Sequence, residues 1–138
     1  MTRISEVPQL LISNSKLVTW VFIGVVFWFV AAMMIRLMGT AVLNPKSINM
    51  VVLFALSFPF GFGAMRLIGW IVGLRGAAFL PAVLMMTATA VFLDGIAFTW
   101  TGLYGLPAES MVYGAAWILF GLGCILMFAL LDSREKAS

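Results

Sequence analysis

The chain has 138 residues, a formal net charge of +3, 64% hydrophobic residues and only 9% charged residues. A typical soluble domain is about 45–50% apolar and about 25% charged, so a soluble protein of this size could not cover so much apolar surface with polar side chains. The composition excludes an ordinary soluble domain and predicts an all-α polytopic membrane protein whose main solvent is lipid.

The first half of the chain predicts a polar leader and two membrane spans. Residues 1–16 form the leader, which ends in polar residues that can cap a helix. An apolar run then predicts the first span at 17–43, and a turn is expected at 44–47 because it contains a proline. The second span is expected at 48–74, where Pro59 should introduce a kink.

The second half of the chain predicts two more spans. Only residues 75–76 separate the second span from a third at 77–104, which predicts a tight antiparallel hairpin between these two spans. A polar connection at 105–110 leads to a fourth span at 111–131. Residues 132–138 form a charged tail.

Four spans within 17–131 predict one transmembrane domain, a four-helix bundle with both termini on the same side of the membrane. The basic residues assigned to that side are Arg3, Lys16, Arg75, Arg134 and Lys136. Fewer basic residues fall on the opposite side, so the positive-inside rule predicts that the N and C termini are cytoplasmic. We therefore expect a multi-pass protein of the cell inner (cytoplasmic) membrane.

Two charged residues lie inside the predicted spans at matching depth. At about 1.5 Å per residue, Arg36 and Asp94 both reach ~27–29 Å above the inner face. An Arg36–Asp94 ion pair at this level would offset much of the free energy that burial of each charge costs. The pair has two interpretations: a structural clamp between helices, or a proton, ion or ligand site that opens to the outer aqueous phase.

Other polar residues of the spans are weaker site candidates. Thr87 and Thr101 lie seven residues either side of Asp94, so they are expected to share its helix face as a polar stripe. Arg66 and Arg75 are expected to contact lipid headgroups on the cytoplasmic side. The alternative for Arg66 is an anion or headgroup site lined by neighbouring glycines.

The residue types that are missing exclude several functions. The chain has no histidine and one cysteine, Cys124. This removes the usual axial ligand of b-type haem, the usual zinc ligand, the most common general base and any intramolecular disulfide. The basic residues are scattered rather than clustered, as a nucleic-acid patch would require. We expect no enzymatic activity, no cofactor, no metal site and no nucleic-acid partner.

Several short motifs follow one another along the chain. They are Arg36-Leu-Met-Gly39 with Pro45, then Leu93-Asp94 before an aromatic stretch and Pro107, then Trp117. Together they resemble a family of small four-span bacterial membrane proteins that is catalogued only as a domain of unknown function. The resemblance implies a four-span fold in a bacterial cytoplasmic membrane. It implies no activity.

The sequence supports two hypotheses of function. The first is a non-enzymatic structural or accessory membrane protein in which Arg36 and Asp94 clamp two helices. The second is a small transporter or channel-like protein that uses Asp94 as a proton or ligand site. The expected partners are the lipid bilayer and either a second copy of the chain or another membrane subunit.

Overall fold

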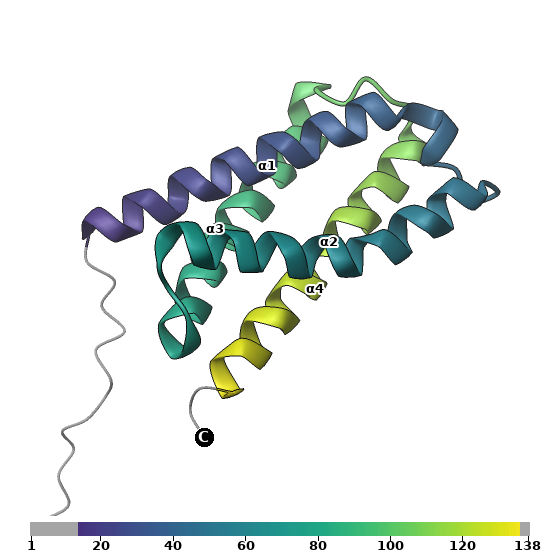
Figure 1. The fold of residues 1–138 in the computed structure, drawn as a ribbon. Coiled ribbons are helices and arrows are strands. Elements are labelled where there is room, and N and C mark those ends of the chain that lie inside the picture. The colour runs from purple at the N-terminus through teal and green to yellow at the C-terminus, as the bar shows by residue number, and fades with distance from the viewer. Residues whose placement is uncertain (1–13, 136–138) are drawn as a thin grey trace, which may run out of the picture.

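The computed structural model describes residues 14–135, which form an all-α bundle (Figure 1). Each of the four long helices is long and apolar enough to cross a membrane, which confirms the predicted fold class. The helices are α1 (Asn14–Val42), α2 (Ile48–Val72), α3 (Phe79–Ile96) and α4 (Ala108–Glu135). A 3₁₀ turn, η1 (Gly76–Ala78), precedes α3, and a π-helical turn, η2 (Ala97–Thr101), follows it.

The helix ends differ from the predicted ones by a few residues. Helix α1 begins inside the predicted leader and α4 continues through most of the predicted tail, whereas 1–13 and 136–138 lie outside the described residues. The third span ends at Thr101 rather than at 104, because Gly102 adopts a left-handed conformation with φ 57° that ends the helix. Tyr104 therefore belongs to a loop.

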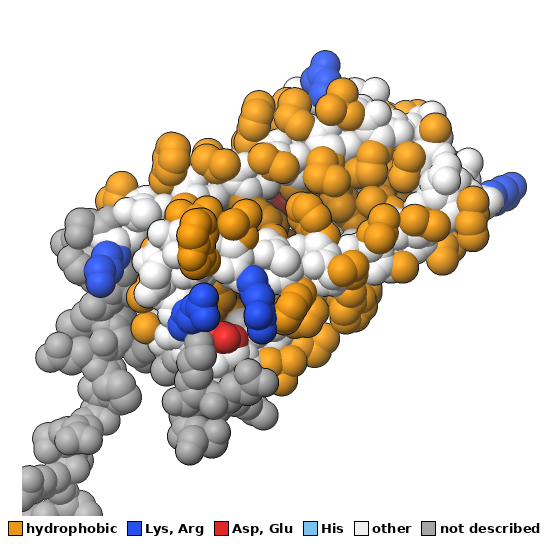
Figure 2. Space-filling view, in the orientation of Figure 1, with side chains coloured by type: hydrophobic (Ala, Val, Ile, Leu, Met, Phe, Trp, Pro, Cys, Tyr) orange, Lys and Arg blue, Asp and Glu red, His pale blue; other side chains and the backbone are white. Residues whose placement is uncertain are grey.

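The outer surface of the bundle is apolar along most of its length. Large side chains such as Phe22, Trp70 and Phe92 are 66%, 71% and 70% exposed. In Figure 2 the hydrophobic side chains cover the middle of the molecule, and the Lys and Arg side chains lie toward its two ends. This distribution is that of a protein surrounded by acyl chains, with charges near the headgroups.

The four helices associate as two pairs. Helix α1 packs along α3, α2 packs along α4, and α3 joins the two pairs through its contact with α4. The predicted hairpin between the second and third spans is wrong, because α2 and α3 do not pack along each other. After α2, the extended residue Arg75 and the turn η1 lead the chain to α1. There the ring centroids of Trp20, on α1, and Phe79, at the start of α3, lie 6.4 Å apart.

Close approach between α1 and α3 depends on Gly24. A Cβ atom at this position would lie 2.7 Å from the backbone oxygen of Met86 and 2.9 Å from the Cβ of Thr89. Only a residue without a side chain fits there, as is common where membrane helices pack tightly.

A polar contact joins the C-terminal end of α4 to the turn η1. Asp132, near the end of α4, accepts a hydrogen bond from the backbone N–H of Gly76 at 3.1 Å. The carboxylate lies at the first residue of η1, where the backbone N–H groups have no partner within the turn. The contact joins the end of α4 to the start of the third span.

We predict that Gly24→Ala destabilises the protein. The added methyl group would clash with backbone, so the expected loss is about 1–3 kcal/mol in the free energy of unfolding. Gly123→Ala is the matched control, because a Cβ atom at this position meets nothing within 4 Å and alanine favours a helix by up to about 1 kcal/mol. Thermal melting in detergent should show a lower midpoint for the first variant alone; equal midpoints would contradict the close packing.

Candidate functional site

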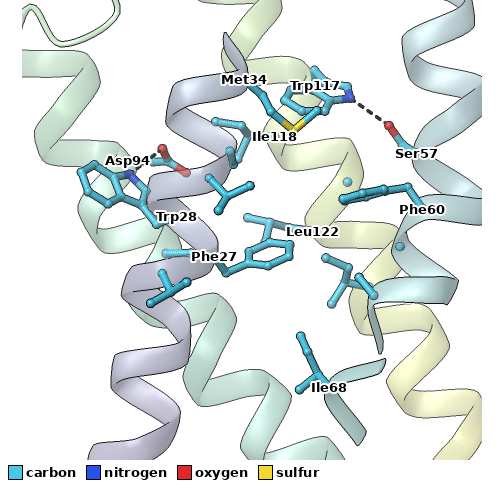
Figure 3. A pocket seen from close by; sticks show the side chains of 18 of the residues that line it. Phe27, Trp28, Met34, Ser57, Phe60, Ile68, Asp94, Trp117, Ile118 and Leu122 are labelled. Carbon is cyan, nitrogen blue, oxygen red and sulfur yellow. Dashed lines mark hydrogen bonds between the residues drawn. The ribbon is translucent and has the colours of Figure 1, made fainter. Parts of the chain in front are cut away.

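The buried acid Asp94 is held by two hydrogen bonds that converge on one oxygen. Asp94 lies on α3 and is 7% exposed. Its Oδ1 accepts from the indole Nε1–H of Trp28 on α1 at 3.0 Å and from the hydroxyl of Tyr104 at 2.9 Å. Figure 3 shows the indole of Trp28 turned toward the carboxylate. Hydrogen bonds to a carboxylate are stronger than those between neutral groups, so this centre ties α1 and the loop after η2 to α3.

The loop after η2 places Tyr104 against Asp94. Gly102 and Gly105 both have positive φ values, 57° and 61°, and Gly105 N–H donates to the Gly102 carbonyl at 3.1 Å. The tyrosine ring is 1% exposed and stacks on Phe98 at 4.3 Å. Burial, together with the hydrogen bond to Asp94, raises the pKa of Tyr104 above its usual value. Its hydroxyl therefore stays protonated and donates at neutral pH.

The second carboxylate oxygen of Asp94 remains available. Within residues 14–135, Oδ2 has no hydrogen-bond partner. Among the side chains described, no fully buried oxygen or nitrogen lacks a partner. Oδ2 must therefore reach a surface, and Asp94 belongs to the wall of an internal cavity.

The predicted Arg36–Asp94 ion pair is not formed. Arg36 is exposed, and its Nη1 donates to the backbone oxygen of Leu103 at 2.7 Å. The residues of α1 that face the core are Ala32 and Ile35, both 0% exposed. Arg36 follows Ile35 by one residue, which turns it about 100° away from that face. The two residues are connected only indirectly, because Arg36 holds the loop residue next to Tyr104.

The other predicted site residues make local contacts. Thr87 is buried on α3 as Asp94 is, whereas Thr101 is exposed. Their hydroxyls donate to the carbonyls of Val83, at 2.9 Å, and Ala97, at 3.0 Å, and not to Asp94. The guanidinium of Arg66 lies 4.8 Å from the centroid of the Phe62 ring. Arg75 is exposed in the connection before η1. Contact of these two arginines with lipid headgroups stays a prediction.

A second indole hydrogen bond joins the other helix pair. Trp117 on α4 donates through Nε1 to the hydroxyl oxygen of Ser57 on α2 at 2.8 Å, and Ser57 in turn donates to the Leu53 carbonyl at 2.9 Å. Sequence reasoning missed this contact and the one made by Trp28. The signal was the position of Trp28 and Trp117 away from the span ends, since a buried indole N–H requires an acceptor.

A cavity of about 460 Å³ lies between the two helix pairs (Figure 3). All four helices line it, mostly with apolar side chains such as Phe27 and Leu122. The polar side chains in its wall are those of the two hydrogen-bonded centres: Trp28, Ser57, Asp94 and Trp117.

The cavity opens sideways between α1 and α2, which make few contacts with each other. Its lining includes Val30 on α1 and Phe60 and Leu67 on α2, which are 49%, 57% and 55% exposed. These residues form a rim on the apolar outer surface. Because that surface faces acyl chains, the opening leads to the interior of the bilayer.

We predict that Tyr104→Phe destabilises the protein by about 1.5–3 kcal/mol, because a hydrogen bond to a charged group is lost. Tyr113→Phe is the matched control, since that hydroxyl makes no hydrogen bond to another residue of the described part of the chain. A double-mutant cycle on thermal stability should give a larger coupling between Asp94→Asn and Tyr104→Phe than between Asp94→Asn and Arg36→Gln. A larger coupling between Asp94→Asn and Arg36→Gln would instead support the predicted Arg36–Asp94 ion pair.

Comparison with protein families, curated proteins and solved structures gives no match to this chain. The resemblance to small four-span bacterial membrane proteins stays a prediction. The geometry of the cavity and of Asp94 is therefore the basis for a functional assignment.

Proposed function

We propose that this protein is a non-enzymatic integral membrane protein that binds a component of the bilayer and holds the apolar part of it in the cavity between α1 and α2. The observation that carries this proposal is the cavity of about 460 Å³ with a rim of exposed apolar side chains. Its volume falls within the roughly 300–1,000 Å³ that small-molecule sites occupy. Such sites are mostly apolar and contain a few placed polar groups, as this one does.

Small residues make the space inside the bundle. Gly121 on α4 lines the cavity, and a Cβ atom at this position would meet nothing within 4 Å. Ala31 on α1 and Ala64 on α2 widen the same region from the two sides. Larger side chains at these positions would fill the volume, so the cavity depends on particular residues of three helices.

The two hydrogen-bonded centres support the walls of the cavity. The Trp28–Asp94 bond holds α1 against α3, and the Trp117–Ser57 bond holds α4 against α2. Each wall is thereby fixed independently, while α1 and α2 make little contact across the opening. A ligand can enter between them from the bilayer without breaking either helix pair.

A small transporter that uses Asp94 is the second candidate function. The observation that favours it is the place of the carboxylate in the cavity wall. Flux of a bound molecule through proteoliposomes, rather than its retention by the purified protein, would favour transport over storage or an accessory role.

The proposed location is the cytoplasmic membrane of a bacterium, with both chain ends in the cytoplasm. The start of α1, the turn η1 and the end of α4 lie at one end of the bundle, as the Trp20–Phe79 and Asp132–Gly76 contacts require. Lys16 and Arg75 lie at this end, and further basic residues stand near both chain termini. The positive-inside rule supports the assignment.

We predict that gently solubilised protein carries a bound bilayer component, which native mass spectrometry will detect as added mass. Gly121→Leu should abolish the added mass, because leucine would fill the cavity. Gly123→Leu is the control: it lies on the same helix in open space and does not line the cavity. Loss of the ligand from neither variant, or the absence of added mass on the wild-type protein, would contradict the proposed function.

We predict opposite labelling of two introduced cysteines in cells. Cys124 is the only cysteine of the chain, so Cys124→Ala provides a cysteine-free background. A membrane-impermeant maleimide should label Ala108→Cys in intact cells and Ala78→Cys only after lysis; both positions are exposed and uncharged. The opposite pattern would reverse the orientation.

A further inference from the structure

We propose that the ligand is a long-chain amphiphile with a protonated amino group, which donates a hydrogen bond to Oδ2 of Asp94 while its chain fills the cavity. This inference rests on the proposed function and adds the chemical class of the ligand. It depends on three features of the cavity: an unused acceptor, an uncompensated charge and a separation of polar from apolar wall.

The unused acceptor is Oδ2 of Asp94. A carboxylate has about four acceptor sites, and both hydrogen bonds that Asp94 accepts go to Oδ1. Oδ2 is not fully buried, because no fully buried side-chain oxygen of the described residues lacks a partner, and Asp94 is one of the residues that line the cavity. A donor group on a ligand would complete the hydrogen bonding of the acid.

When Asp94 is ionised, its charge has no counterion among the described residues of the cavity wall. Trp28 and Tyr104 donate hydrogen bonds to Asp94, but both are neutral. Within 14–135, the residues that line the cavity include no Lys or Arg, and Arg36 is engaged with the Leu103 carbonyl. A buried carboxylate is stable in lipid when it is paired with a cation. An ammonium group supplies both the positive charge and the N–H donors.

The wall of the cavity also matches the shape of an amphiphile. In Figure 3 the carboxylate of Asp94 and the hydroxyl of Ser57 lie at a similar height on opposite sides of the cavity, with Met34 and Ile118 between them. The apolar side chains of Phe27, Leu122 and Ile68 lie below this level. From Ser57 to Ile68 the rise along α2 is about 16 Å. A polar head beside Asp94 would leave its apolar chain along this part of the wall, where burial is favourable.

Brominated probes test the inference, because bromine quenches the fluorescence of nearby tryptophans. The probes are a bromoalkane and the alcohol, amine and N-acetylated amine of the same chain length. The protein carries Trp70→Phe and Trp100→Phe, which remove two indoles that are 71% and 77% exposed to the surroundings. Three tryptophans remain: Trp28 and Trp117 line the cavity, and Trp20 does not. Saturable quenching of Trp28 and Trp117 in liposomes then reports occupation of the cavity, and linear quenching reports partition into lipid.

The expected result is saturable quenching by the amine at a mole fraction about tenfold lower than by the alkane, as a hydrogen bond to a charged group implies. Asp94→Asn should remove this preference, so that the amine and the alkane quench at similar mole fractions. With Asp94 present, the acetylated amine should quench at about the same mole fraction as the alkane, because it carries no positive charge. This comparison keeps the test valid if Asp94→Asn does not fold.

The outcomes separate the two proposals. Equal saturable quenching by amine, acetylated amine and alkane would overturn the amino-group inference and leave the cavity as an apolar site. Only linear quenching by every probe would overturn both. Gly121→Leu should abolish saturable quenching by all probes, and Gly123→Leu should retain it, so quenching that persists in the first variant would place the probes outside the cavity.

Discussion

A tryptophan N–H inside a lipid-embedded bundle needs an acceptor from another part of the protein, because acyl chains offer none. Two tryptophans meet this requirement, one within each helix pair. Trp28 donates to Asp94 and Trp117 donates to Ser57. Each bond fixes the rotation of one helix against its neighbour, which apolar packing alone specifies weakly. The arrangement of α1 with α3, and of α2 with α4, follows from these two contacts together with the close approach at Gly24.

The cavity is a consequence of this pairing. Polar contacts and close packing hold each pair together, whereas α1 and α2 make few contacts across the space between them. The bundle is closed on the side where α3 meets α4 and open on the other. An acid that helps to build one wall is therefore also exposed to whatever enters the opening, so Asp94 has a structural part, through Oδ1, and a free part, Oδ2.

Composition and the uncharged runs were enough to predict the all-α four-span fold, because lipid requires long helices that satisfy their own backbone. The partner of Asp94 could not be predicted in the same way. Partner choice depends on helix rotation, where one residue shifts a side chain by about 100°, and it separates the exposed Arg36 from the buried Ile35 beside it. Tyr104 was hidden for another reason: it was assigned to a helix, whereas a two-glycine loop carries it.

Because the cavity opens sideways between α1 and α2, its occupancy depends on the composition of the membrane. Under the proposed function, molecules that reach the cavity come from the surrounding leaflet, so their abundance relative to other lipids, rather than their concentration in water, sets how often the site is filled. Neighbouring acyl chains compete for the same volume at all times. A change in membrane composition would alter the state of the protein even when the amounts of protein and ligand in the cell stay constant.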